Sequence, residues 1–256
     1  MACDRFLNFN QASAFTSFHR KLAVLIEPYL DRQWTMADVG CGLALLDFEI
    51  ADKVRSIDAI DIDEAIVKEI DSHIDCEAIL GHNAVEKIHP RLLDSTDLGD
   101  QTWDIVLASF YGKSLSELDE LIGHAKHRAI FILHGRRPNG RFDPYDGDSG
   151  EITAEELEPY LVQQGYRFKK TVAELQFGQP FKTIEDIHNF LARYKAQGHS
   201  ADAVFKIPPV SEMPFAEFDA ENHMLSTEER IIKTDRYDFP FYLPNNFCVG
   251  IFAIVK

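Results

Sequence analysis

Apolar residues follow two alternating spacings along the first 135 residues of the chain. Spacings of three and four positions predict helices over 13–30, 43–53, 63–74 and 114–126. Short apolar runs predict strands over 35–39, 54–63, 76–81, 103–110 and 128–135. Strands that alternate with helices in this way form a parallel sheet covered by helices on both faces. Ligands bind to such sheets outside the carboxyl ends of the strands, so the functional site is expected there.

The pattern changes after residue 135. A stretch rich in Gly, Pro, Asp and Arg predicts a loop, which is followed by a helix and a strand within 152–168. A further helix is predicted over 183–198 and a last strand over 245–256. The segment 176–235 has no place in a minimal sheet, so we expect it to be a substrate-binding cap over the ligand face. The core then comprises 1–175 together with 236–256.

Composition narrows the class of partner. The formal net charge of −16, from 42 acidic and 26 basic residues, would repel a long polyanion, so we expect no nucleic-acid partner. The four cysteines show neither a C-x-x-C pair nor zinc-site spacing, which predicts free thiols in a reducing compartment and no metal site. The first residues carry no signal pattern, and no apolar run approaches the roughly 18 residues that span a bilayer. We therefore expect a cytoplasmic protein without a membrane partner.

The stretch MADVGCGLA, at 36–44, places an acid two residues before a Gly-x-Gly turn. A dinucleotide-binding turn, G-x-G-x-x-G, needs a glycine or another small residue where this chain has Leu45. The pattern acid-x-Gly-x-Gly-x-small instead fits at Asp38, Gly40, Gly42 and Ala44. In this the chain resembles the class I S-adenosylmethionine-dependent methyltransferases.

Three later landmarks extend the resemblance. AIDID supplies Asp61, 19 residues after Gly42, at the position where the family holds the ribose hydroxyls. ILGHNA offers Asn83 for the adenine amino group, and WDIVLASFYG matches the family's fourth strand and the loop that faces the sulfonium. The resemblance implies an α/β, Rossmann-like fold with a mostly parallel seven-stranded sheet and an antiparallel last strand, to which the segment 176–235 adds the helical cap. It implies S-adenosylmethionine as the cofactor, bound by Asp38, Gly40, Cys41, Gly42, Asp61, Ile62, Asn83, Ala84, Ser109 and Phe110.

Two residues are candidates for catalysis. Tyr111 follows the fourth strand and His134 ends the fifth, so either could take a proton at the ligand edge, although both also suit packing roles. Ser109-Phe110-Tyr111-Gly112 lacks the two prolines of the enzymes that methylate nucleic-acid amino groups. Arginines at positions 136, 137 and 141 suit an anionic substrate, although pairing with nearby surface acids explains them as well.

These observations favour methyl transfer from S-adenosylmethionine to a small-molecule acceptor. One alternative keeps the cofactor and makes a protein side chain the acceptor. Another is a non-catalytic module that binds the cofactor and acts through protein contacts, and a blocked cofactor crevice would favour it. Neither the acceptor atom nor the oligomeric state follows from the sequence.

Overall fold

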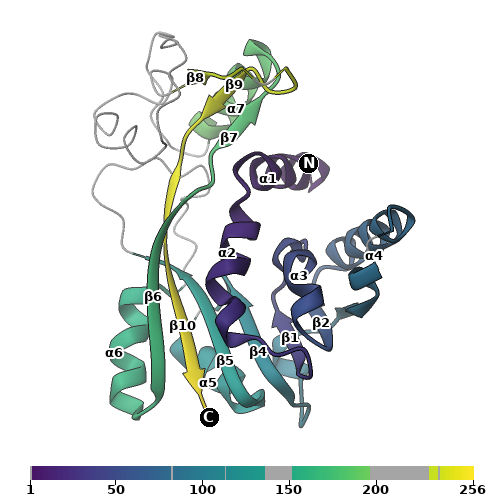
Figure 1. Cartoon of the computed structure of the whole chain (residues 1–256). Helices are drawn as coiled ribbons and strands as arrows, with labels where there is room; N and C mark the ends of the chain where they lie inside the picture. Colours follow the sequence, from purple (N-terminus) through teal and green to yellow (C-terminus); the bar gives the residue numbers. More distant parts are fainter. Residues whose placement is uncertain (1, 82, 113, 136–151, 197–230, 236) are drawn as a thin grey trace. The chain divides into compact units, whose positions relative to one another are not determined.

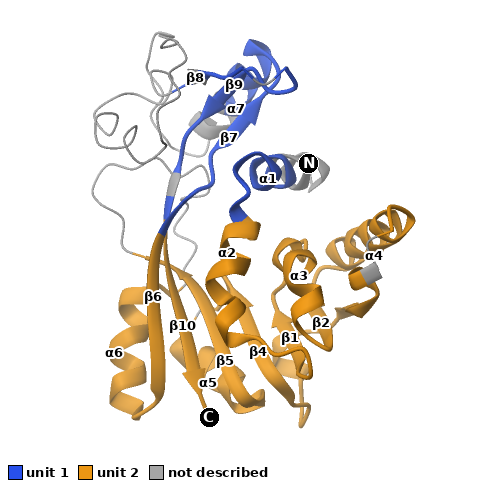
Figure 2. Ribbon diagram, viewed as in Figure 1, with its two compact units in different colours: residues 1–18, 137–149, 174–247 blue, residues 19–136, 150–173, 248–256 orange. Residues whose placement is uncertain are grey.

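The computed structural model describes residues 2–81, 83–112, 114–135, 152–196, 231–235 and 237–256 (Figure 1). The chain forms two compact units (Figure 2). The larger unit comprises 19–136, 150–173 and 248–256, and the smaller comprises 1–18, 137–149 and 174–247. The predicted loop after residue 135, with its three arginines, lies outside the described residues apart from Gly135.

A seven-stranded sheet organises the larger unit, in the order β3-β2-β1-β4-β5-β10-β6. Its strands are β1 (Thr35–Val39), β2 (Ser56–Asp61), β3 (Ile88–Leu92), β4 (Trp103–Ser109), β5 (Ala125–His134), β6 (Arg167–Gln176) and β10 (Asn246–Val255). The first five strands pair in parallel, and β10 is antiparallel to β5. The predicted fold class, with its antiparallel last strand, is confirmed. The strand order reverses between β1 and β4, which is where sheets of this kind bind ligands.

Helices connect these strands. They are α2 (Phe18–Ile26), α3 (Leu45–Ile50), α4 (Glu64–Ile79), α5 (Leu115–His124) and α6 (Ala154–Gln164), with 3₁₀ turns η1 (Glu27–Tyr29), η2 (Ala51–Lys53), η3 (Asn83–Lys87) and η4 (Ser95–Asp97). Side-chain caps fix the starts of α4 and α5, where Asp63 accepts from the Ala65 amide and Ser114 accepts from the Glu117 amide. Leucines of α5 and α6 pack into a fully buried cluster against the central strands, which fixes the sheet beneath the site.

The predicted strand over 76–81 is wrong. Residues 76–79 continue α4, because no glycine or proline interrupts the helix before Gly81. The third strand is β3, whose sequence IHPRL contains a proline and two polar residues. A proline is tolerated there because β3 is an edge strand, paired only with β2 in the sheet.

The smaller unit contains helices and a second sheet. Its elements are α1 (Ala2–Thr16), β7 (Gln179–Phe181), α7 (Ile184–Ala196), β8 (Ile232–Lys233) and β9 (Phe241–Leu243), with strand order β7-β9-β8. Aromatic rings hold it together, since Phe18 lies 4.6 Å from Phe177 and Phe15 lies 4.8 Å from Tyr242 between ring centroids. The first 18 residues and 236–247, which the sequence assigned to the core, group with this unit. That the unit serves as a substrate-binding cap stays a prediction.

Among the described residues, no helix is both long and apolar enough to cross a membrane. Cys41, Cys76 and Cys248, the described cysteines whose side chains are placed, form no disulfide among the described residues.

Candidate functional site

The glycine turn lies at the carboxyl end of β1, at the reversal of strand order. Gly40 and Gly42 have φ values of +71° and +53°, which L side chains rarely adopt, so the turn requires the glycines found there. The Gly40 amide donates to the Ile60 carbonyl at 2.9 Å, which fixes the loop to β2. A Cβ added at Gly42 would meet nothing within 4 Å, so this glycine borders open space. The sequence thus folds into a backbone cradle that is open on one side.

Asp61, at the end of β2, is tied to this turn. Its Oδ2 accepts the Gly42 amide at 3.0 Å, and its Oδ1 accepts the Asp63 amide at 2.9 Å. A carboxylate has about four acceptor positions, so both oxygens keep capacity for further donors. The two backbone bonds hold the carboxylate at the mouth of the cradle, where it can accept hydrogen bonds from a diol.

Two carboxyl groups are buried behind the turn. Asp38 is 2% exposed and Asp47, on α3, is completely buried. Apart from the contact of Asp38 and Asp47 with each other, Asp38 Oδ1 and both oxygens of Asp47 have no hydrogen-bond partner among the described residues. Burial raises the pKa of Asp38 to about 7; a hydrogen bond with Asp47 opposes this rise, and the charge of Asp61 adds to it. Burial, with the charge of Asp38, also raises the pKa of Asp47 well above its usual range.

A crevice of about 360 Å³ opens beside the turn. Its lining residues are Val39, Gly40, Ile60, Asp61, Ile62, Leu93, Asp94, Ser95, Thr96, Phe110, Tyr111, Gly112 and Glu117. All of these are described, and none is a lysine or arginine, whereas three are acidic. The crevice is therefore suited to a ligand that carries positive charge.

Tyr111 and Phe110 reach the crevice from the end of β4. The Tyr111 hydroxyl lies 2.8 Å from Ser95 Oγ and 2.8 Å from Glu117 Oε1, in hydrogen bonds with both. Burial, with the hydrogen bond to Glu117, raises the pKa of Tyr111 to about 12. The Phe110 ring packs 4.6 Å from the His134 ring between centroids. His134 itself does not line the crevice.

The structure brings most of the predicted residues to one edge. Gly40, Asp61, Ile62, Phe110 and Tyr111 line the crevice. Asp38, Cys41, Gly42, Ser109 and His134 lie in the same loop and strand ends without lining it. Burial raises the pKa of the Cys41 thiol, so it stays protonated. The catalytic and cofactor-binding roles of all these residues stay predictions.

Asn83 and Ala84 are the exception. They lie in η3, which precedes β3, and therefore at the amino end of the strand rather than at its carboxyl end. Their placement in the site is wrong because it depended on the incorrect third strand. The residues that do follow β3 into the crevice are Leu93, Asp94 and Ser95. Asp94 carries a sequence signal, because D-S-T is a side-chain cap motif, and its carboxylate accepts the Thr96 amide at 2.9 Å.

Comparison with known proteins supports the fold. No protein-family model and no curated protein match the chain. The solved YcgJ protein of Bacillus subtilis is 13% identical and matches 91% of this chain and 97% of its own, with a TM-score of 0.51. A protein of Bacillus halodurans C-125 with a provisional methyltransferase assignment is 14% identical and matches 93% of this chain and 98% of its own, with a TM-score of 0.53.

At such identities, similarity is informative about the fold alone. Together with the sheet order and the antiparallel β10, these matches show that the chain has the Rossmann-like fold of the class I S-adenosylmethionine-dependent methyltransferases.

Proposed function

We propose that the protein binds S-adenosylmethionine and transfers its methyl group to a small-molecule acceptor. The observation that carries this proposal is the bond from the Gly42 amide to the Asp61 carboxylate at the mouth of an acidic crevice. It joins two of the landmarks that carry the sequence resemblance, the glycine turn and the acid at the end of the second strand. The fold alone would not distinguish this ligand from others, because one fold hosts many functions.

The residues present fit the parts of this cofactor. The free acceptor capacity of Asp61 suits the ribose hydroxyls, and the open side of Gly42 leaves room for a ligand against the backbone. Ile62, 68% exposed beside Asp61, offers an apolar surface to a flat base. Asp94 suits the amino group of adenine. When bound, S-adenosylmethionine supplies an electrophilic methyl group, and the protein's part is to align the acceptor with it.

Charge favours this cofactor over a nicotinamide dinucleotide. The sulfonium of S-adenosylmethionine is a cation, whereas the pyrophosphate of a dinucleotide is an anion. Asp61, Asp94 and Glu117 line the crevice without a lysine or arginine among the lining residues, so an anion there would meet repulsion. Leu45, which takes the place of the third glycine of a dinucleotide turn, begins α3 and argues in the same direction.

The nature of the acceptor rests on weaker support. The net charge of −16 and the absence of the two prolines after the fourth strand favour a small molecule over nucleic acid. Tyr111 is a poor general base at neutral pH, since its pKa is about 12. His134 is the better candidate for accepting a proton, because an imidazole titrates near neutral pH.

One observation favours a second candidate, a non-catalytic module. The Tyr111 ring packs directly on Gly40, so part of the crevice is filled by the protein's own side chain. A module that has lost its cofactor would tolerate such filling permanently. An enzyme would need the ring to move.

Calorimetric titration with S-adenosylmethionine, S-adenosylhomocysteine and NAD tests the cofactor. We expect binding of the first two, at least tenfold weaker in Asp61→Asn, since one acceptor oxygen becomes an amide NH2 and the remaining oxygen no longer carries a charge. Asp52→Asn, which removes an exposed acid elsewhere, is the matched control. Binding of NAD alone, or of none of the three by both the unchanged protein and Tyr111→Phe, would refute the proposal.

Methyl transfer is tested with S-adenosylmethionine labelled in its methyl group and a cell extract separated by size. Label that enters the small-molecule fraction, and fails to do so with Asp61→Asn, supports the proposed acceptor class. Label in the protein fraction would favour a protein acceptor. Cofactor binding without any transfer would favour the non-catalytic module.

A further inference from the structure

The Tyr111 ring lies against the backbone of the first glycine of the turn. A Cβ built on Gly40 would stand 2.1 Å, 2.6 Å and 2.8 Å from three carbons of the ring, distances at which no side chain fits. Gly40 and Tyr111 both line the crevice, together with Asp61 and Ile62. The ring therefore covers the part of the crevice where the glycine backbone would otherwise be open to a ligand.

Two partners hold the ring in this position through its hydroxyl. Ser95 Oγ and Glu117 Oε1 each lie 2.8 Å from the Tyr111 oxygen. The Tyr111 hydroxyl donates toward both oxygens, and Ser95 Oγ in turn donates to Glu117 Oε1 at 3.4 Å, so the three groups form one hydrogen-bonded cluster in which Glu117 only accepts. Hydrogen bonds to a charged group are the stronger kind, which makes Glu117 the principal restraint. Ser95 and Glu117 come from η4 and α5, so two separate elements fix one side chain.

The backbone on both sides of Tyr111 is fixed. The Phe110 amide donates to the Ile132 carbonyl at 2.7 Å, and the Gly112 carbonyl accepts the Ile152 amide at 3.1 Å. A Cβ on Gly112 would stand 2.6 Å from Leu118, so this residue is also confined. The movement open to Tyr111 is therefore a rotation of its side chain.

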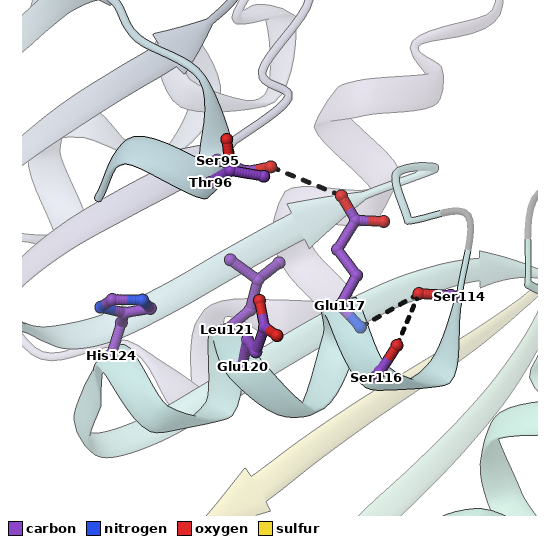
Figure 3. Close-up of a pocket in the computed structure, with 8 residues that line it drawn as sticks. All are labelled: Ser95, Thr96, Ser114, Ser116, Glu117, Glu120, Leu121 and His124. Atoms are coloured by element: carbon purple, nitrogen blue, oxygen red, sulfur yellow. Dashed lines mark hydrogen bonds between the residues drawn. The ribbon is translucent and has the colours of Figure 1, made fainter. Parts of the chain in front are cut away.

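Open space lies beyond the two partners. A groove of about 220 Å³ runs along α5 and is lined by Ser95, Thr96, Ser114, Ser116, Glu117, Glu120, Leu121 and His124 (Figure 3). Ser95, Thr96 and Glu117 line both this groove and the crevice. The hydroxyl of Tyr111 thus sits where the two spaces meet.

We propose that Tyr111 is a latch on the cofactor crevice. In the unbound protein its ring covers Gly40, and a ligand that lies against the glycine turn takes the place of the ring. Ser95 and Glu117 are positioning residues that set how readily the ring leaves. The inference rests on the proposed function, because the ligand that displaces the ring is taken to be S-adenosylmethionine or S-adenosylhomocysteine.

A latch reduces the measured affinity, because only the open fraction of the protein binds. Tyr111→Phe keeps the ring and loses both hydrogen bonds, so it opens more readily. We expect S-adenosylhomocysteine to bind about tenfold more tightly to this variant than to the unchanged protein. Glu117→Gln should also bind more tightly, by several-fold. Glu120→Gln removes a carboxylate from the same groove and the same helix, and serves as the matched control.

The position of the ring is followed by ¹⁹F NMR of protein labelled with fluorotyrosine. The resonance that is absent from Tyr111→Phe belongs to Tyr111. We expect it to move on saturation with S-adenosylhomocysteine, and to move in the same direction in unliganded Glu117→Gln. Either shift, together with the tighter binding of Tyr111→Phe, supports the latch.

The failures are distinguishable. Equal or weaker binding by Tyr111→Phe, with a Tyr111 resonance that does not move while the ligand binds, overturns the latch and leaves the proposed function standing. If S-adenosylmethionine and S-adenosylhomocysteine bind to neither the unchanged protein nor the two latch variants, the proposed function fails and the latch fails with it. Binding to Tyr111→Phe alone supports the latch in its strongest form.

Discussion

Replacing Asp38 by Asn should stabilise the unliganded protein, by an amount that depends on pH. Asp38 is 2% exposed and, apart from its contact with Asp47, its Oδ1 has no hydrogen-bond partner among the described residues. Burial raises its pKa from 3.8 to about 7. The folded carboxyl group therefore holds its proton more tightly than the unfolded one, and the stability of the unchanged protein falls as the pH rises from about 4 to 7.

The magnitude follows from the size of the shift. A difference of about 3 pH units, at about 1.4 kcal/mol for each, gives about 4 kcal/mol of lost stability above pH 7. Asn has a similar shape and no charge to bury, so Asp38→Asn avoids this loss. The variant should match the unchanged protein near pH 4 and exceed it by about 4 kcal/mol at pH 8. For a unit of this size the gain corresponds to a rise of about 10 °C in melting temperature.

Urea unfolding at half-unit steps from pH 4 to pH 8.5 measures the difference directly. Glu49→Gln is the matched control, because it removes an exposed acid from the helix that carries Asp47. The reasoning is refuted if Asp38→Asn differs from the unchanged protein by a constant amount at every pH. It is also refuted if the variant is the less stable of the two at pH 8.

Three further predictions concern stability. Gly40→Ala should cost about 3 kcal/mol, since its Cβ would stand 2.1 Å from the Tyr111 ring, and adding Tyr111→Ala should restore at least about 1 kcal/mol in a double-mutant cycle of urea unfolding. Burial lowers the pKa of His19 to about 3, so the free energy of unfolding should fall by about 2 kcal/mol as the pH drops from 6.5 to 5. His19→Gln should lack this fall, and the same dependence of stability on pH in the variant would contradict the prediction. Trp103→Phe removes the 2.8 Å hydrogen bond from the indole to Asp58 and should lower the free energy of unfolding by about 2 kcal/mol. A melting temperature within one degree of the original, which corresponds to about 0.3 kcal/mol, would count against this prediction.

The sequence predicted the elements whose signals are local. β4 and β5 contain continuous apolar runs, which are typical of strands buried on both faces. The predicted bounds of both strands agree with the structure within a few residues. The family resemblance pointed to the glycine turn and to Asp61, which lie within 25 residues of each other, and the structure places both at the same edge of the sheet. The hydrogen bond from the Gly42 amide to the Asp61 carboxylate follows from the order of the sheet, because β1 and β2 are neighbouring strands and the two residues lie at their carboxyl ends.

Features that depend on tertiary context were missed. The edge strand β3 lacks an apolar run because one side of it has no neighbouring strand, so the sequence pointed to the apolar end of α4 instead. Because of this error, the sequence pointed to Asn83, which precedes β3, and missed Asp94, which follows β3 and lines the crevice. The contact of Tyr111 with Gly40 joins residues far apart in the chain, and no local pattern encodes it. Asp47 could have been noticed, since helical spacing places it on the buried face with Ile50.

Unfavourable local features concentrate at the carboxyl edge of the sheet. Ala44 and Phe110 adopt positive φ values of +53° and +51°, which cost non-glycine residues about 1 kcal/mol or more each. Asp38 and Asp47 add buried carboxyl groups to the same edge. Each of these could be relieved by one substitution that leaves the sheet unchanged, such as Gly at position 44 or Asn at position 38. A chain that needed this edge only for packing would gain stability from such changes. Their joint presence around one crevice supports a ligand-binding role. The gain in folding stability from Asp38→Asn measures how much stability the protein gives up by keeping the Asp38 carboxylate at this edge.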